Sequence, residues 1–137
     1  MRTVKDIMRS IVKIDSQQTV LEAAHLMKRT DQGSLLVVEG DIYVGILTER
    51  DLLMRVVAED LPHSSLVSSV MSSPLRVVDA STSLKKAAEI MCEHKIRRLP
   101  IRDCGAVIGI AVASDVLRQL SRKTLTEEIS DALTEKH

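Results

Sequence analysis

The chain has 137 residues, enough for one domain or for two small halves that share a core. Hydrophobic residues make up 45% and charged residues 28%, proportions that indicate a globular protein rather than a disordered one. The 19 basic residues balance the 19 acidic ones, and aromatic residues are nearly absent, so the composition argues against a nucleic-acid-binding protein.

The N-terminal residues, starting Met1-Arg2-Thr3, contain no long apolar core, so we expect no signal peptide. No apolar run approaches the ~20 residues that a membrane span needs. Cys92 and Cys104 are too few for a disulfide framework, and the scattered histidines lack the spacing of metal ligands. We therefore expect a cytoplasmic protein with reduced cysteines and without a metal site.

Two segments, 20–27 and 84–91, have the spacing of amphipathic helices. Each carries apolar residues at positions i, i+3, i+4 and i+7, which places them on one buried face. Thr19 and Ser83 directly precede these segments and are typical N-cap residues. The methionines of these stripes, Met27 and Met91, are expected in the core.

Each of these helices is followed by a pair of short apolar strands and then by a second helix. The expected strands are 35–38 with 42–47, and 99–101 with 106–111; the closing helices are 49–58 and 114–121. The strands are apolar on both faces, which is typical of a sheet covered by helices.

The whole chain is an internal repeat. Repeat 1 spans residues 1–60, a Pro- and Ser-containing linker spans 61–66, repeat 2 spans 67–122, and a short helical tail follows over 123–137. Each repeat has the order strand–helix–strand–strand–helix, which predicts an α/β (α+β) fold. Because a half of this size is marginally stable by itself, the two halves should pack together.

The stretch Gly45-Ile46-Leu47-Thr48-Glu49-Arg50-Asp51 joins a strand to a helix in repeat 1. One interpretation is a capping box, in which Thr48 and Asp51 each bond the other's backbone N–H. The other is a ligand site, because unpaired N–H groups at a helix start attract phosphate and a carboxylate accepts from the two hydroxyls of a ribose.

The same motif recurs in repeat 2 as Gly109-Ile110-Ala111-Val112-Ala113-Ser114-Asp115. Valine replaces the threonine at position 112, so the capping pair is lost although Asp115 remains. Two interpretations stay open for Asp115. It interacts with the helix dipole behind a Ser114 cap, or it belongs to a second ligand site.

These recurring motifs resemble a tandem pair of cystathionine-β-synthase-type (CBS) domains, a stand-alone Bateman module. The segment His94–Ile101 is similar to a typical stretch of that family, and the resemblance covers residues 3–121. It implies two βαββα units packed about a pseudo-two-fold axis, with two clefts between them. It also implies regulatory binding of an adenosine-containing ligand, without catalysis.

The resemblance also implies the residues of the first cleft. Asp51 would bind ribose hydroxyls, and Thr48 would help to hold phosphate. The first strand of the other copy and its Arg-Arg-Leu-Pro segment would close the same cleft crosswise. The residues expected there are Leu75 and Arg76, then Arg97, Arg98 and Pro100. Leu75 would lie against adenine, and the arginines would bind phosphate. From the residues alone, a solvated strand start is the favoured interpretation of these arginines.

The second cleft is expected to be poorer. Asp115 would face a wall made by Ile11 and Val12, while Gly33 and Ser34 stand where the other copy has its two arginines. This cleft therefore lacks positive charge for phosphate and should hold a nucleoside weakly or stay empty.

We thus expect a regulatory module for AMP, ADP or ATP that needs no cofactor and performs no catalysis; its regulated partner protein is unknown. The alternative is a structural homodimerisation module without ligand. A homodimer is expected in both cases, because the closing helices carry more apolar residues than one core needs: Leu52, Leu53, Val56, Val57, Val116, Leu117 and Leu120.

Overall fold

The computed structural model describes residues 2–121 and 133. Contacts divide the chain into two compact units, each described here by itself. Unit 1 is Met1–Ser10 with Val77–His137, and unit 2 is Ile11–Arg76. Both units are mixed α+β, with a small three-stranded sheet in each, which confirms the predicted fold class. The helical tail predicted over 123–137 lies outside the described residues, apart from residue 133.

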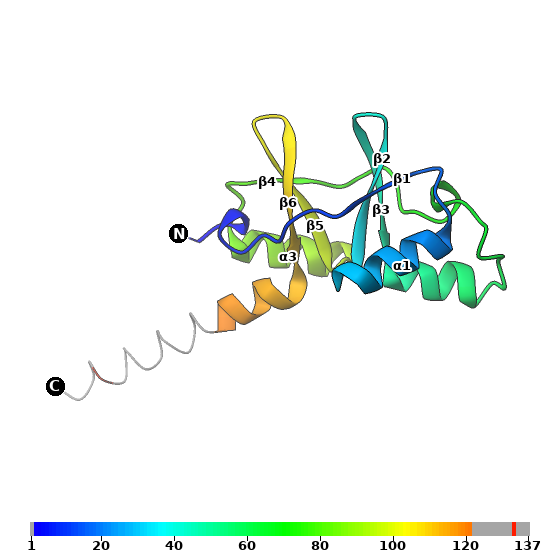
Figure 1. The fold of residues 1–137 in the computed structure, drawn as a ribbon. Coiled ribbons are helices and arrows are strands. Elements are labelled where there is room, and N and C mark those ends of the chain that lie inside the picture. The colour runs from blue at the N-terminus through cyan, green and yellow to red at the C-terminus, as the bar shows by residue number, and fades with distance from the viewer. Residues whose placement is uncertain (1, 122–132, 134–137) are drawn as a thin grey trace. The chain divides into compact units, whose positions relative to one another are not determined.

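Unit 2 contains the sheet β1-β2-β3 and helix α1 (Figure 1). Its elements are β1 Lys13–Asp15, α1 Val20–Thr30, β2 Ser34–Glu39, β3 Ile42–Thr48, α2 Glu49–Asp51, the π-helix η2 Leu52–Val57 and the 3₁₀ turn η3 Val67–Ser69. β1 runs parallel to β2, and β2 runs antiparallel to β3. Parallel pairing requires a crossover, which α1 supplies between β1 and β2.

Unit 1 repeats this architecture. Its elements are the 3₁₀ turn η1 Val4–Asp6, β4 Val78–Asp79, α3 Leu84–His94, β5 Arg98–Asp103, β6 Ala106–Val112 and a helix over 113–121. β4 is parallel to β5, and β5 is antiparallel to β6, with the same irregularity in register as in unit 2.

The ends of α1 and α3 follow from their sequences. Thr19 accepts a hydrogen bond from the Glu22 N–H and Ser83 accepts one from the Lys86 N–H, so both predicted N-caps are confirmed. Each helix ends at a residue in the left-handed region, which turns the chain toward the next strand.

Each repeat begins with a lead-in segment, residues 4–9 in repeat 1 and the corresponding residues 67–72 in repeat 2, and each segment packs against the β-hairpin of the other repeat. Arg9 and Ile110 exchange backbone hydrogen bonds of 2.8 and 3.0 Å, so the N-terminal segment joins unit 1 (Figure 1). Ser72 and Ile46 exchange bonds of 3.0 and 2.9 Å in unit 2. Each spatial unit therefore combines the lead-in segment of one repeat with the hairpin of the other. The boundaries of the sequence repeats remain a prediction.

Glycine is required where these lead-ins cross the hairpins. A Cβ on Gly45 would lie 2.7 Å from the Ser72 carbonyl oxygen, and a Cβ on Gly109 would lie 2.6 Å from the Met8 sulfur. The glycine of each Gly-to-Asp motif thus leaves room for the lead-in segment that passes over it, because it has no Cβ. The sequence alone did not indicate this role.

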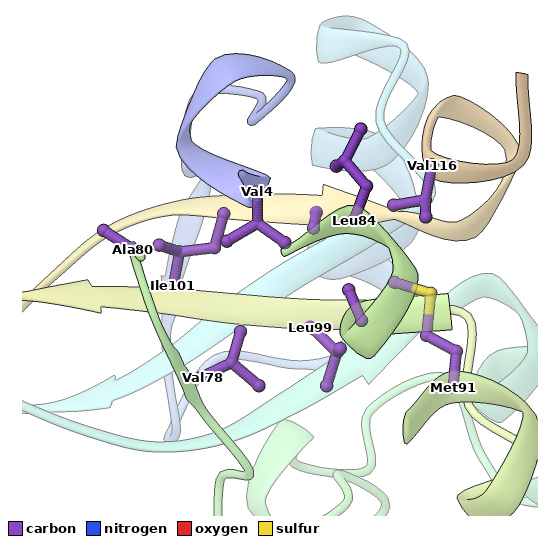
Figure 2. Close-up of a cluster of buried hydrophobic side chains, with 10 residues drawn as sticks. Val4, Val78, Ala80, Leu84, Met91, Leu99, Ile101 and Val116 are labelled. Atoms are coloured by element: carbon purple, nitrogen blue, oxygen red, sulfur yellow. The ribbon is translucent and has the colours of Figure 1, made fainter. Parts of the chain in front are cut away.

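Each unit has an aliphatic core. In unit 1, Figure 2 shows Val4 of the N-terminal segment next to Ile101 of β5, with Leu84 and Met91 contributed by α3. Ile14, Leu35 and Leu47 are similarly buried in unit 2. Burying such a side chain contributes about 1.5–3 kcal/mol, and both cores include the methionine of the helical stripe as predicted. Over the described residues, no helix is long and apolar enough to cross a membrane.

Candidate functional site

The Thr48–Asp51 pair is a complete capping box at the end of β3. The Thr48 hydroxyl accepts from the Asp51 N–H at 3.2 Å, and Asp51 Oδ2 accepts from the Thr48 N–H at 2.9 Å. The Thr48 hydroxyl also lies 3.1 Å from the same carboxylate oxygen. The capping interpretation is therefore confirmed, while the ligand interpretation stays a prediction.

The capping box leaves part of the Asp51 carboxylate unused. Oδ2 takes the capping contacts, whereas Oδ1 lies 3.7 Å from Nε of Arg55. Arg55 directs its Nη1 to the carbonyl oxygens of Val70 and Met71, at 3.1 and 3.2 Å. Asp51 is thus held in a fixed position that retains acceptor capacity on Oδ1.

The predicted helix over 49–58 is α-helical for only three residues and continues as the π-helix η2. Its wider turns are visible in the bond from Ala58 N–H to the Leu53 carbonyl, at 2.9 Å and five residues apart. Arg55 of this helix reaches the segment at Val70, and Val56 is buried in the core. π-Helical turns are frequent at functional sites, and the apolar spacing of residues 49–58 did not predict this one.

The corresponding position in unit 1 is built differently. The helix begins at residue 113, so Ser114 lies within its first turn and the predicted Ser114 cap is wrong. Asp115 instead forms an ion pair with Arg9, whose Nε lies 2.7 Å from Oδ2 and whose Nη2 lies 3.0 Å from Oδ1. Nη1 of Arg118 adds a contact of 3.3 Å to Oδ1. Sequence reasoning missed Arg9, although the repeat comparison places Ser72 at its position and thereby marks a difference.

This ion pair lowers the pKa of Asp115. The hydrogen bond from Arg9 is the largest cause, and it outweighs the opposing effect of burial. A carboxyl whose pKa is lower in the folded state adds stability above its unfolded pKa of about 4, and this stability is lost as the pH falls through the lower folded pKa.

Arg9→Ser should therefore cost about 1 kcal/mol at pH 7, since the guanidinium is partly exposed and solvent weakens the pair. The variant should also lose less stability than wild type as the pH falls below about 4. Urea unfolding from pH 7 to pH 3 measures both effects. Lys5→Ser is the matched control, because the Lys5–Asp103 pair of 3.3 Å is more exposed. If the unfolding free energy of Arg9→Ser fell with pH as steeply as that of wild type, Arg9 would not be the cause of the lowered Asp115 pKa.

The structure places Leu75 and Arg76 in unit 2, together with Thr48 and Asp51. Both residues precede β4, which begins only at Val78, so the expectation that they lie in a strand is wrong. They follow the cis Ser73–Pro74 bond and the pairing of Ser72 with β3. Leu75 is half-buried and Arg76 is exposed.

Arg97, Arg98 and Pro100 lie in unit 1, at the start of β5. The Arg97 carbonyl accepts from the Ala113 N–H at 2.8 Å, and Arg98 pairs with Val112. Arg97 is exposed, Arg98 is half-buried and Pro100 is buried. The backbone of both arginines thus lies beside the helix of Asp115, and their crosswise approach to Asp51 remains a prediction.

The remaining second-cleft residues lie in unit 2. Ile11 and Val12 are half-buried just before β1, and the Val12 carbonyl accepts from the Leu36 N–H at 2.9 Å. Ser34 is buried and pairs with Thr48 at the start of β2. Asp115 belongs to unit 1, so this cleft also stays a prediction. Among the described residues, no cluster of three His, Cys, Asp or Glu side chains is placed to hold a metal.

Residues 4–58 and 67–122 each match the family model of the CBS domain. The chain belongs to the CBS domain family. It is 37% identical over 126 residues to the CBS domain-containing protein YhcV of Bacillus subtilis, and the match covers 90% of both chains.

Solved structures of CBS proteins share the fold. A putative signal-transduction protein with CBS domains from Burkholderia ambifaria has a TM-score of 0.79 and 34% identity, over 84% of this chain and 85% of that one. The hexameric CBS-CP12 protein from bloom-forming cyanobacteria has a TM-score of 0.78 and 30% identity, over 85% of this chain and 70% of that one. Tandem CBS domains are regulatory modules, so the coarse functional class agrees with the prediction.

Proposed function

We propose that this CBS pair is a non-catalytic regulatory module that binds AMP, ADP or ATP. The observation that carries the proposal is the arrangement of Asp51, whose carboxylate is fixed by a cap at a helix start while Oδ1 keeps acceptor capacity. A fixed carboxylate suits a ribose diol, and the arginines predicted for this cleft suit phosphate. At the helix start itself, the N–H groups of Glu49 and Asp51 already bond Gly33 and Thr48. The proposal includes a cytoplasmic location, and the regulated protein is unidentified.

A thermal-shift panel with AMP, ADP, ATP, S-adenosylmethionine and NADH tests the proposal. A ligand that binds only the folded state at about 100 times its Kd stabilises it by about 2.7 kcal/mol, which gives a rise in Tm of several degrees. We expect that rise for at least one adenine nucleotide. A turnover assay with the tightest ligand should show no product, since the described site contains no paired acid and base next to a nucleophile.

The alternative function is a structural dimerisation module without ligand. Two observations favour it: both oxygens of Asp115 are engaged by Arg9, and part of η2 is exposed and apolar. Absence of a thermal shift with every nucleotide, together with a stable dimer, would select this alternative.

Two of the residues expected at the dimer face are buried in the cores instead. Val56 is 4% exposed and Val116 is 0% exposed, so the prediction was wrong for these two. Leu53, Val57 and Leu117 remain more than half exposed, at 58%, 63% and 56%. Exposed apolar side chains of this kind, present in each unit, are typical of an interface.

We expect a homodimer at tens of micromolar, with about twice the 15.1 kDa mass of the chain. Leu53→Asp should dissociate it, because a charge placed in an apolar interface is left without a partner. Ile42→Asp is the matched control, since Ile42 is equally exposed, at 68%, but lies on β3. Light scattering that gives a monomer for wild type would refute the homodimer.

A further inference from the structure

Arg9 and Ser72 occupy the same backbone position in the two units. Each exchanges two backbone hydrogen bonds with the isoleucine that follows the motif glycine, Ile110 for Arg9 and Ile46 for Ser72. The backbones are therefore equivalent, and the difference lies in the side chains. Arginine is long enough to reach the aspartate of its unit, whereas serine is too short.

The Arg9 side chain engages both oxygens of Asp115. The contacts of 2.7 Å to Oδ2 and 3.0 Å to Oδ1 form the bidentate pair that a planar guanidinium makes with a carboxylate. The Asp115 side chain is 15% exposed and that of Asp51 is 12% exposed, so the two carboxylates differ in their partners rather than in their burial. Ribose hydroxyls would have to compete with these guanidinium donors at both oxygens, whereas at Asp51 only Oδ2 carries short contacts.

Asp51 has no such arrangement. Its nearest cation is Arg55, at 3.7 Å from Oδ1, and Nη1 of Arg55 is directed to the carbonyls of Val70 and Met71. The bidentate contact that occupies Asp115 is therefore absent from the described surroundings of Asp51.

We infer that Arg9 is a specificity-determining residue: it occupies the carboxylate of Asp115 and so restricts ribose binding to Asp51. This inference rests on the proposed function. It explains why two repeats with the same aspartate would give one nucleoside site per chain. Arg9 acts from the lead-in segment, outside the Gly-to-Asp motif itself.

Calorimetric titration with adenosine tests the inference, because a nucleoside carries no phosphate that would attract arginine. The background is Asp51→Ala, which removes the first site. Asp51→Ala/Arg9→Ser should bind adenosine about tenfold more tightly than Asp51→Ala, since Asp115 becomes available to the diol. 2′,3′-Dideoxyadenosine, which lacks both hydroxyls, should show no gain.

Two controls keep the test decisive. Arg9→Gln in the same background keeps much of the side-chain length without the charge, and it should show a smaller gain than Arg9→Ser. It takes the place of the serine variant in the test if that variant does not fold. In the ligand-free protein, carbon NMR should show the Asp115 carboxyl titrating at higher pH in Arg9→Ser than in wild type. The inference is overturned if neither folded variant gains affinity, if dideoxyadenosine gains equally, or if the titration is unchanged. The proposed function is tested separately, by AMP binding to wild type.

Discussion

Replacing Asp51 by alanine is expected to weaken AMP or ATP binding by about 30- to 150-fold, or 2–3 kcal/mol. The carboxylate would no longer accept from the ribose hydroxyls, and a hydrogen bond to a charged group is among the stronger ones. The substitution also removes the acceptor of the capping box, because Oδ2 bonds the Thr48 N–H. A loss of stability of about 1 kcal/mol should therefore accompany the loss of affinity.

A matched control separates the two effects. Asp6→Ala removes the same type of capping box, in which the Thr3 N–H donates to the Asp6 carboxylate at 2.8 Å. It should lower stability without a change in affinity. Asp115→Ala should likewise change affinity little, since Arg9 already occupies that carboxylate. Calorimetry that shows equal losses for Asp51→Ala and Asp115→Ala would mean that the two sites are equivalent.

The second large effect is expected at Gly45. The added Cβ of Gly45→Ala would meet the Ser72 carbonyl oxygen at 2.7 Å and the Met71 sulfur at 2.9 Å. A backbone atom cannot move aside as a side chain can, so the crossing segment must shift. We expect a loss of about 1–3 kcal/mol in the free energy of unfolding, as in other overpacked sites. Nucleotide affinity should fall as well, because Arg76 follows the displaced segment.

Gly109→Ala is the matched control at the equivalent position. Its Cβ would lie 2.6 Å from the Met8 sulfur but 3.1 Å from the nearest backbone atom, the Arg9 carbonyl oxygen. Because methionine is flexible, this variant should lose less stability than Gly45→Ala. Denaturant unfolding of both variants measures the difference. A larger loss of unfolding free energy in Gly109→Ala than in Gly45→Ala would contradict this prediction.

Local features were well predicted from the sequence. The helical spacing and the caps at Thr19 and Ser83 correctly predicted where α1 and α3 begin, because these signals depend on residues only a few positions apart. The strand pairs followed from short apolar runs around turns that contain glycine.

Features that depend on distant partners were not predicted from the residues alone. Two similar lead-ins fit two similar hairpins, so the repeat does not say which lead-in joins which unit. The Arg9–Asp115 pair joins the lead-in segment of repeat 1 to the closing helix of repeat 2, and it was missed for the same reason. Among the described residues of unit 1, the π-helix η2 has no counterpart, since the helix over 113–121 is α-helical. Apolar spacing does not distinguish the two helix types over one turn.

Calorimetric titration of the wild-type chain with AMP and with 2′,3′-dideoxy-AMP tests the central claim most directly. The two ligands share the base and the phosphate and differ only in the hydroxyls that Asp51 is proposed to bind. We predict one AMP site per chain and an affinity for the dideoxy ligand that is about 30-fold or more lower. Equal affinity for both ligands, or no binding of AMP, ADP or ATP at millimolar concentration, would contradict the account.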